Sequence, residues 1–265
     1  MNRPRVPRLR SLLQGRRSRM LLRVAGLVLL LGGLKLLVHR LGLELISLNP
    51  LFSALVASTV FLLGFLLNGV LTDFKESEKL PGEIATSLET LSLELRAIPS
   101  HNPGAEIDPA CRAVRQLGWE MLGWIRGGLS TADLLQGFQR CHGQVVAAAA
   151  LLPPSTLKGR LMAEMATLLR AINRIETIRE TSFVPLVYWL AYAGTALLCG
   201  GLILAESTDV REAFFFLCVI AFLLIFLLQL IRDLDNPFGQ GDSDSAEDVS
   251  LEVLEAALLR LDRSA

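Results

Sequence analysis

A stripe of small, aromatic and polar side chains runs along one apolar segment and is the feature of the sequence best suited to a function. The segment, residues 51–72, holds 22 residues without a charge. Steps of three and four residues return to one face of a helix, and they place six residues on that face. These residues, called the stripe below, are Ala54, Ala57, Phe61, Phe65, Asn68 and Thr72. The stripe suits a helix that lines a passage, and it equally suits a helix that packs against others. Both interpretations stay open.

Oxygen-bearing side chains near the C-terminus form a second group with possible chemistry. Ca²⁺ takes about six to eight oxygen ligands, so this group is a candidate cation-binding tail. Its members are Asp235, Asn236, Asp242 and Asp244. Their spacing fits no EF-hand, and Asn236-Pro237 is typical of a turn. We therefore favour a turn followed by a solvated linker, and we expect no metal site.

Other chemistry is not indicated by the sequence. The four cysteines have no CxxC spacing, and the three histidines have no metal-site spacing. We find no glycine-rich phosphate loop, no GxSxG and no HExxH. The acidic residues of the middle region alternate with basic ones at helical spacing, which is typical of a solvated face. We therefore expect neither an enzyme nor a cofactor, and no nucleic-acid partner.

The composition predicts an integral membrane protein. The chain has 265 residues, of which 52% are hydrophobic, and a mean hydropathy of +0.47. Uncharged runs of about 20 residues are long enough to cross a bilayer as helices. The four expected spans are 20–38, 51–72, 183–205 and 213–231. They form two hairpins, 20–72 and 183–231, and the whole chain is expected to be all-α. Lys35, near the outer end of the first span, is expected to reach the membrane surface.

The remaining regions are expected outside the bilayer. Residues 1–19 form a basic arm, residues 73–182 a helical domain, and residues 232–265 an acidic tail with a short helix over 249–261. In the middle region, Asp108 is expected to cap one helix and Ser130 to begin a capping box for the next.

Basic residues set the expected orientation. The first 23 residues contain eight arginines and no acidic residue. The positive-inside rule then places both termini and the middle region in the cytoplasm. Arg16-Arg17 before an apolar run could also indicate a twin-arginine export signal. We favour an uncleaved span, because Lys35 interrupts the run and no small-residue cleavage site follows.

Four short segments, in the same order along the chain, resemble the bestrophin family of pentameric ion channels, especially its bacterial members. Residues 61–68 are similar to the FxLGF segment of the second span, which asparagine follows in bacterial members. Residues 185–188 are similar to the PLVY that opens the third span. Residues 235–239 are similar to the (D/N)PFG after the fourth span, and residues 249–255 to the tail helix. The resemblance covers roughly residues 18–262.

The resemblance implies a homopentamer in a bacterial inner membrane that passes small inorganic ions, anions such as chloride above all. The second spans would form a hydrophobic neck lined by Ala57, Phe61, Phe65 and Asn68, which gates by dewetting. A second constriction would fall near residues 155–161. The family's arginine and paired tryptophans after the second span are missing here, so a non-conducting membrane scaffold or sensor is the alternative. A secondary transporter ranks third, because the hairpins are not recognisable repeats of each other.

Overall fold

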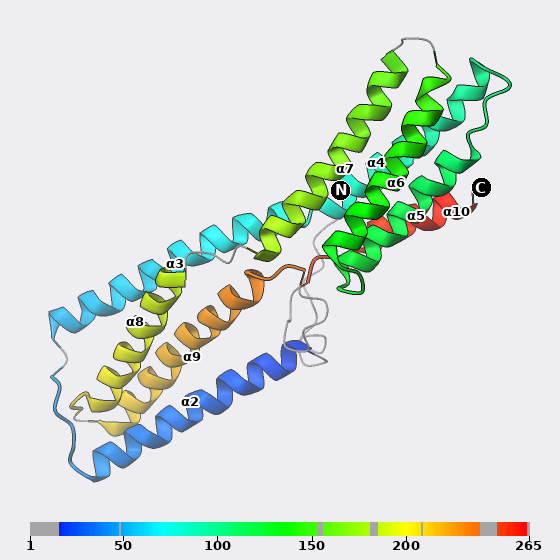
Figure 1. Cartoon of the computed structure of the whole chain (residues 1–265). Helices are drawn as coiled ribbons and strands as arrows, with labels where there is room; N and C mark the ends of the chain where they lie inside the picture. The colour runs from blue at the N-terminus through cyan, green and yellow to red at the C-terminus, as the bar shows by residue number, and fades with distance from the viewer. Residues whose placement is uncertain are drawn as a thin grey trace, which may run out of the picture. The chain divides into compact units, whose positions relative to one another are not determined.

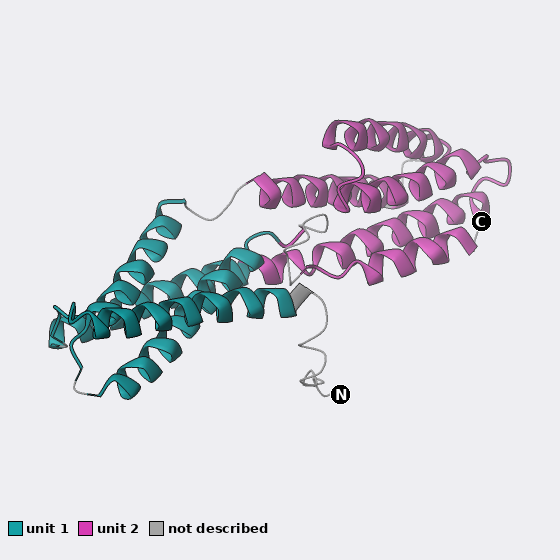
Figure 2. Cartoon of the chain, turned by 90° about the horizontal axis from the view of Figure 1, so that it is seen from below, with its two compact units in different colours: residues 1–72, 182–236, 243–247 teal, residues 73–181, 237–242, 248–265 magenta. Residues whose placement is uncertain are grey.

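The computed structural model describes residues 16–47, 49–152, 156–180, 185–207, 209–238 and 248–263 (Figure 1). Regular structure within these ranges is helical, apart from an isolated parallel bridge between Ile46 and Ala205. The all-α prediction is confirmed. The chain divides into two compact units, shown in Figure 2. Unit 1 comprises residues 1–72, 182–236 and 243–247, and unit 2 comprises residues 73–181, 237–242 and 248–265.

Unit 1 is built from the apolar helices of the chain. They are α2 (Arg16–Arg40), α3 (Pro50–Ser77), α8 (Pro185–Leu204) and α9 (Val210–Leu234), and α3 enters unit 2 at Asp73. All four are long and apolar enough to cross a membrane, as the sequence predicts. The charge at Asp73 does not end α3, which continues to Ser77, because a helix outside the bilayer tolerates charged side chains.

Two glycines of α8 bring α3 close to it. A Cβ atom added to Gly194 would lie 3.3 Å from Thr59 Oγ1, and one added to Gly201 would lie 2.8 Å from Phe52 Cε2. The contact residues are seven apart on both helices and run in opposite orders, so α3 and α8 are antiparallel along this contact. Small residues of this kind let apolar helices approach closely.

Unit 2 is a set of helices around one apolar core. Its helices are α4 (Leu80–Ala97), the 3₁₀ turn η1 (Ile98–Ser100), α5 (Asp108–Ile125), α6 (Thr131–Ala150), α7 (Thr156–Glu180) and α10 (Glu252–Arg263). Each main helix contributes residues at helical spacing to this core, among them Leu88, Leu117, Leu168 and Leu258, which are fully buried. Burying such side chains is the main force that holds the unit together.

Two helix starts in unit 2 test the predicted caps. Ser130 Oγ accepts a hydrogen bond from the Asp133 backbone N–H at 3.2 Å, which confirms the cap of α6. The prediction for Asp108 was wrong: Asp108 is the first helical residue of α5, and Ile107 occupies the cap position without a side-chain bond. Pro109 therefore sits at the second helical position.

The tail helix begins later than the sequence predicts. The Val249 N–H donates to the Pro237 carbonyl at 3.0 Å, and the Glu252 N–H donates to Ser250 Oγ at 3.4 Å. The Leu251 carbonyl accepts from the Glu255 N–H at 3.0 Å, and α10 starts at Glu252. Leu254 and Leu258 then anchor the helix in the core of unit 2.

Candidate functional site

The stripe on α3 is exposed in the single chain. Phe61 is 76% exposed and Phe65 is 60% exposed. Ala57 and Asn68, the other predicted neck residues, are exposed as well. The structure therefore brings all four together on one side of one helix, where no other described residue buries them.

The opposite side of α3 carries the contacts with its own chain. Leu63, Leu66 and Val70 are no more than 1% exposed. At about 100° per residue, the centre of this buried face lies roughly 160° from the centre of the stripe. The apolar window of α3 is also the least buried of the four, at 17% against 28% for both α2 and α9. Packing within the chain thus explains the leucine face, and among the described residues the stripe has no packing partner.

The stripe is more apolar than its residue types suggest. The Thr72 hydroxyl donates to the Asn68 carbonyl of its own helix at 2.8 Å. Because this hydroxyl is satisfied internally, its methyl group is the part left to form contacts. The neck residues therefore offer two bulky rings, separated by about 6 Å along the helix axis, beside one amide at Asn68.

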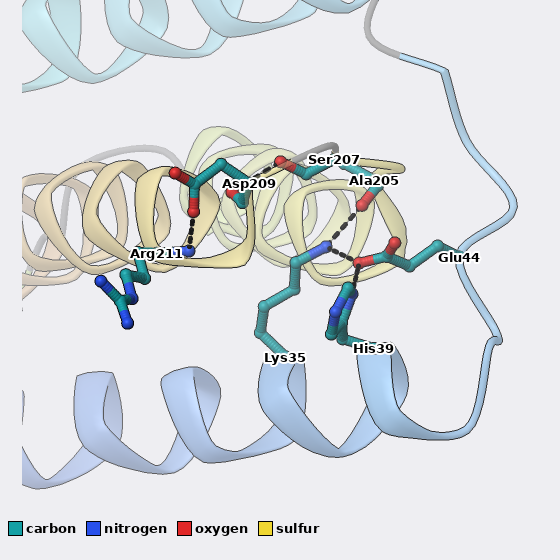
Figure 3. Close-up of polar contacts among 7 residues, drawn as sticks. All are labelled: Lys35, His39, Glu44, Ala205, Ser207, Asp209 and Arg211. Carbon is teal, nitrogen blue, oxygen red and sulfur yellow. Dashed lines mark hydrogen bonds and ion pairs between the residues drawn. The ribbon is translucent and has the colours of Figure 1, made fainter.

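A charged cluster lies at the C-terminal end of α2 (Figure 3). Lys35 Nζ donates to Glu44 Oε1 at 2.7 Å and also to the Ala205 carbonyl. His39 Nδ1 lies 3.1 Å from the same Glu44 oxygen. The Lys35 side chain is fully buried, and its ammonium ends on the loops that follow α2 and α8. Its place near the outer membrane surface stays a prediction. Glu44 and Ala205 supply the polar partners that make its burial tolerable.

Backbone hydrogen bonds connect the two loops at this end of unit 1. The N–H groups of Leu45 and Ile46 donate to the Leu204 carbonyl at 3.0 and 3.1 Å, and the Glu206 N–H donates to the Ile46 carbonyl at 2.8 Å. The loop after α2 is therefore tied to the loop after α8 by backbone bonds as well as by Lys35. No sequence pattern indicates this pairing, since neither loop alternates apolar and polar residues as a strand does.

The predicted tail group is only partly described. Asp235 caps α9, with its N–H donating to the Ile231 carbonyl at 3.1 Å, and the Asn236 N–H donates to the Asp233 carbonyl at 3.4 Å. These bonds form a turn. Asp242 and Asp244 lie outside the described residues. Within the described ranges, no group of three His, Cys, Asp or Glu residues could hold a metal ion.

Arg179 of α7 makes a group of contacts in unit 2 that the sequence analysis did not predict. Its Nη2 donates to the Ile125 carbonyl at 2.5 Å and to the Trp124 carbonyl at 3.2 Å, at the end of α5. Its guanidinium also lies over the Trp124 ring, 4.7 Å from the centroid, and 5.9 Å from the Phe238 centroid. Burial lowers the pKa of Arg179, and the carbonyls and rings compensate its charge.

Comparisons with known proteins identify the fold. No protein-family model and no curated protein matches the chain. A solved structure of a bacterial bestrophin homolog from Klebsiella pneumoniae, carrying one mutation, is 17% identical, with a TM-score of 0.74 over 91% of this chain and 97% of that chain. Another structure of a bacterial bestrophin homolog from that organism is 19% identical, with a TM-score of 0.69 over 92% and 96%. The chain is a membrane protein with the fold of these homologs.

Proposed function

We propose that the chain is a bestrophin-like ion channel, in which copies assemble around an axis and α3 lines a hydrophobic neck. The observation that carries the proposal is the exposed stripe: Phe61 and Phe65 lie open while Leu63 and Leu66, on the same helix, are buried. A lipid-facing helix has no need of small residues and an amide beside two rings. Five copies, as the resemblance implies, would place five such stripes around one axis.

The chemistry of the neck favours small inorganic ions, with anions such as chloride preferred. Two layers of phenyl rings about 6 Å apart exclude water when the neck is narrow, which is gating by dewetting. The edges of aromatic rings carry partial positive charge, so rings that present their edges to the axis tolerate an anion better than a cation. Asn68 would supply a polar contact at one end of the dry segment.

We place the channel in a bacterial inner membrane with both termini in the cytoplasm. The support is the eight arginines among the first 23 residues, which the positive-inside rule assigns to the cytoplasmic side. Unit 2, which follows α3 directly, is then cytoplasmic. Reporter fusions after residues 120 and 250 should read inside, and a fusion in the loop after α8 should read outside.

The decisive experiment replaces both rings in the variant Phe61→Ala, Phe65→Ala. The double variant should widen and wet the neck, so ion flux into liposomes should rise or become constitutive. Assembly, measured by size-exclusion chromatography with light scattering, should survive because neither ring is buried within its own chain. Flux measured after replacing chloride with a large organic anion, and then potassium with a large organic cation, reports which ion carries the current.

A matched control lies on the other face of the same helix. The variant Leu63→Ala, Leu66→Ala removes two fully buried side chains, each of which costs about 2–5 kcal/mol. This variant should lose thermal stability and oligomer without a gain of flux. A well-assembled phenylalanine variant with unchanged flux would reject the neck and favour the alternative, a non-conducting scaffold or sensor that acts through unit 2.

A further inference from the structure

A second candidate site lies in unit 2, where three arginines line one cavity. The chain has one cavity of about 440 Å³ and another of about 330 Å³.

 The two volumes belong to different cavities: the 440 Å³ cavity lies among α2, α8 and α9 of unit 1, and the 330 Å³ cavity lies in unit 2. The smaller one is called the arginine pocket below. Its polar lining comes from the last turns of α4 and the first turns of α5. These residues are Ser92, Arg96, Asp108, Cys111, Arg112 and Arg115.

Positive charge dominates the arginine pocket. Arg96 comes from the last turn of α4, and Arg112 and Arg115 lie three residues apart on α5. All three arginines line this one pocket together with Cys111. Asp108 is the one acidic residue among the lining residues. Neither Arg112 nor Arg115 forms an ion pair with another described residue.

The start of α5 adds hydrogen-bond donors to the same pocket. Ile107 and Asp108, the cap and first residue of α5, both line it, and no side chain caps the helix. The first N–H groups of a helix lack internal partners and carry partial positive charge, which favours an anion. Ser92, only 7% exposed, presents a hydroxyl group from the wall formed by α4.

We propose that the arginine pocket binds a phosphate-bearing dianion, such as a phosphate monoester. Arginine forks match the oxygens of a phosphate group in pairs, and Arg112 and Arg115, which form no ion pair with another described residue, leave two cations to face the charge of that group. The volume of 330 Å³ is near the lower end of the range of about 300–1,000 Å³ for ligand pockets. The ligand is therefore small, or it is the headgroup of a lipid. This site is independent of the proposed conduction through α3.

The experiment measures thermal unfolding of the purified full chain in detergent, with glycerol phosphate as the probe. At fixed ionic strength, saturating probe should raise Tm by about 2–4 °C, and chloride at the same ionic strength should not. The variant Arg112→Gln, Arg115→Gln should lose this rise. The variant Arg112→Lys, Arg115→Lys keeps both charges without the forks, so it should retain only part of the rise.

A charge-matched control is the variant Lys158→Gln, Arg263→Gln, which removes two exposed basic residues away from the pocket. It should keep the full rise in Tm. The proposal fails if glycerol phosphate does not stabilise the wild-type chain, or if the pocket variant and the control respond alike. It also fails if glycerol phosphate leaves the Tm of the wild-type chain unchanged while the glutamine variant loses its oligomer by light scattering. The arginines then contact another copy of the chain.

A lipid arm separates the two sources of phosphate. The chain is reconstituted in phosphatidylcholine vesicles with or without phosphatidic acid, and binding of radiolabelled glycerol phosphate is measured. If the wild-type chain loses glycerol phosphate binding only in vesicles with phosphatidic acid, a lipid headgroup is the occupant. The glutamine variant should bind the probe in neither kind of vesicle. Binding that is equal in both vesicles identifies a soluble ligand. Either result supports the pocket, and absence of binding in both vesicles overturns it.

Discussion

Arg174 holds Glu76 with two parallel hydrogen bonds. Its Nε lies 3.0 Å from Glu76 Oε1, and its Nη2 lies 2.6 Å from Oε2. Glu76 belongs to the last turn of α3, and Arg174 belongs to α7. The pair therefore fixes the end of the helix that carries the stripe to the longest helix of unit 2.

The variant Glu76→Gln should destabilise unit 2 modestly. Both side chains are partly exposed, so solvent screening limits the loss to about 0.5–1 kcal/mol. The hydrogen bond from Arg174, the largest cause, lowers the pKa of Glu76 below 4.5. Its stabilisation is therefore complete above pH 4.5 and is lost as the pH falls through the lower folded value. A double-mutant cycle with Arg174→Gln, followed by chemical denaturation, measures the coupling; a coupling of zero at low salt would contradict the prediction.

The variant Glu44→Gln should destabilise unit 1 more strongly. It leaves the buried ammonium of Lys35 without its carboxylate, and removing one partner of a buried pair costs on the order of 3 kcal/mol. The hydrogen bond from Lys35 is the largest cause that lowers the pKa of Glu44. This contribution is thus complete above pH 4.5 and is lost as the pH falls through the lower folded pKa of Glu44. Thermal unfolding of wild type and variant at pH 7 measures the difference.

The control for Glu44 removes both charges together. In Lys35→Met, Glu44→Gln no unpaired charge remains, and replacing a buried pair by apolar groups is often close to neutral. The double variant should therefore recover most of the stability that Glu44→Gln loses. A double variant that is less stable than Glu44→Gln alone would show that Lys35 contributes through its bond to the Ala205 carbonyl.

The variant Arg179→Met should destabilise unit 2 by about 2–4 kcal/mol. It removes charged hydrogen bonds to the carbonyls of Trp124 and Ile125, and it also removes the cation–π contacts. The matched control is Arg170→Met on the same helix, where an exposed side chain bonds only Thr167 and the expected change is below about 0.5 kcal/mol. Chemical denaturation followed by tryptophan fluorescence measures both, and equal losses would contradict the role of Arg179.

Local pattern predicted the parts of the structure that depend on local physics. The uncharged run at 51–72 indicated a helix because burying a backbone in lipid requires internal hydrogen bonds, and α3 forms there. The helical spacing also grouped Phe61 with Phe65, which the structure places on one exposed side. Ser130 was predicted as a cap because its partner, Asp133, is only three residues away.

Contacts between distant residues could not be predicted in this way. The Lys35 ammonium bonds a carbonyl 170 residues further along the chain, and Arg179 bonds one 54 residues earlier. The residues next to Lys35 and Arg179 in the sequence do not indicate either partner. The bond from the Val249 N–H to the Pro237 carbonyl, just before α10, is another contact between residues distant in the sequence.

The hydroxyl group of Thr195 is the basis of a last prediction. Thr195 lies in α8, lines the 440 Å³ cavity of unit 1 and is 5% exposed. Its Oγ1 has no hydrogen-bond partner among the described residues. Hydroxyl groups on α3 differ from that of Thr195, since Ser58 and Thr72 each donate to the carbonyl four residues earlier, at 2.8 Å. Thr195 therefore carries the cost of an unsatisfied buried polar group, about 1–3 kcal/mol.

The variant Thr195→Val should be at least as stable as the wild type, with a gain of about 1 kcal/mol, because valine keeps the shape and removes the hydroxyl. Thr195→Ser is the matched control: it keeps the hydroxyl, loses a methyl group and should lose about 1 kcal/mol. Thermal unfolding in detergent compares the three proteins. If Thr195→Val is instead less stable than the wild type, the hydroxyl has a partner in the cavity, and a bound molecule or another copy of the chain supplies it.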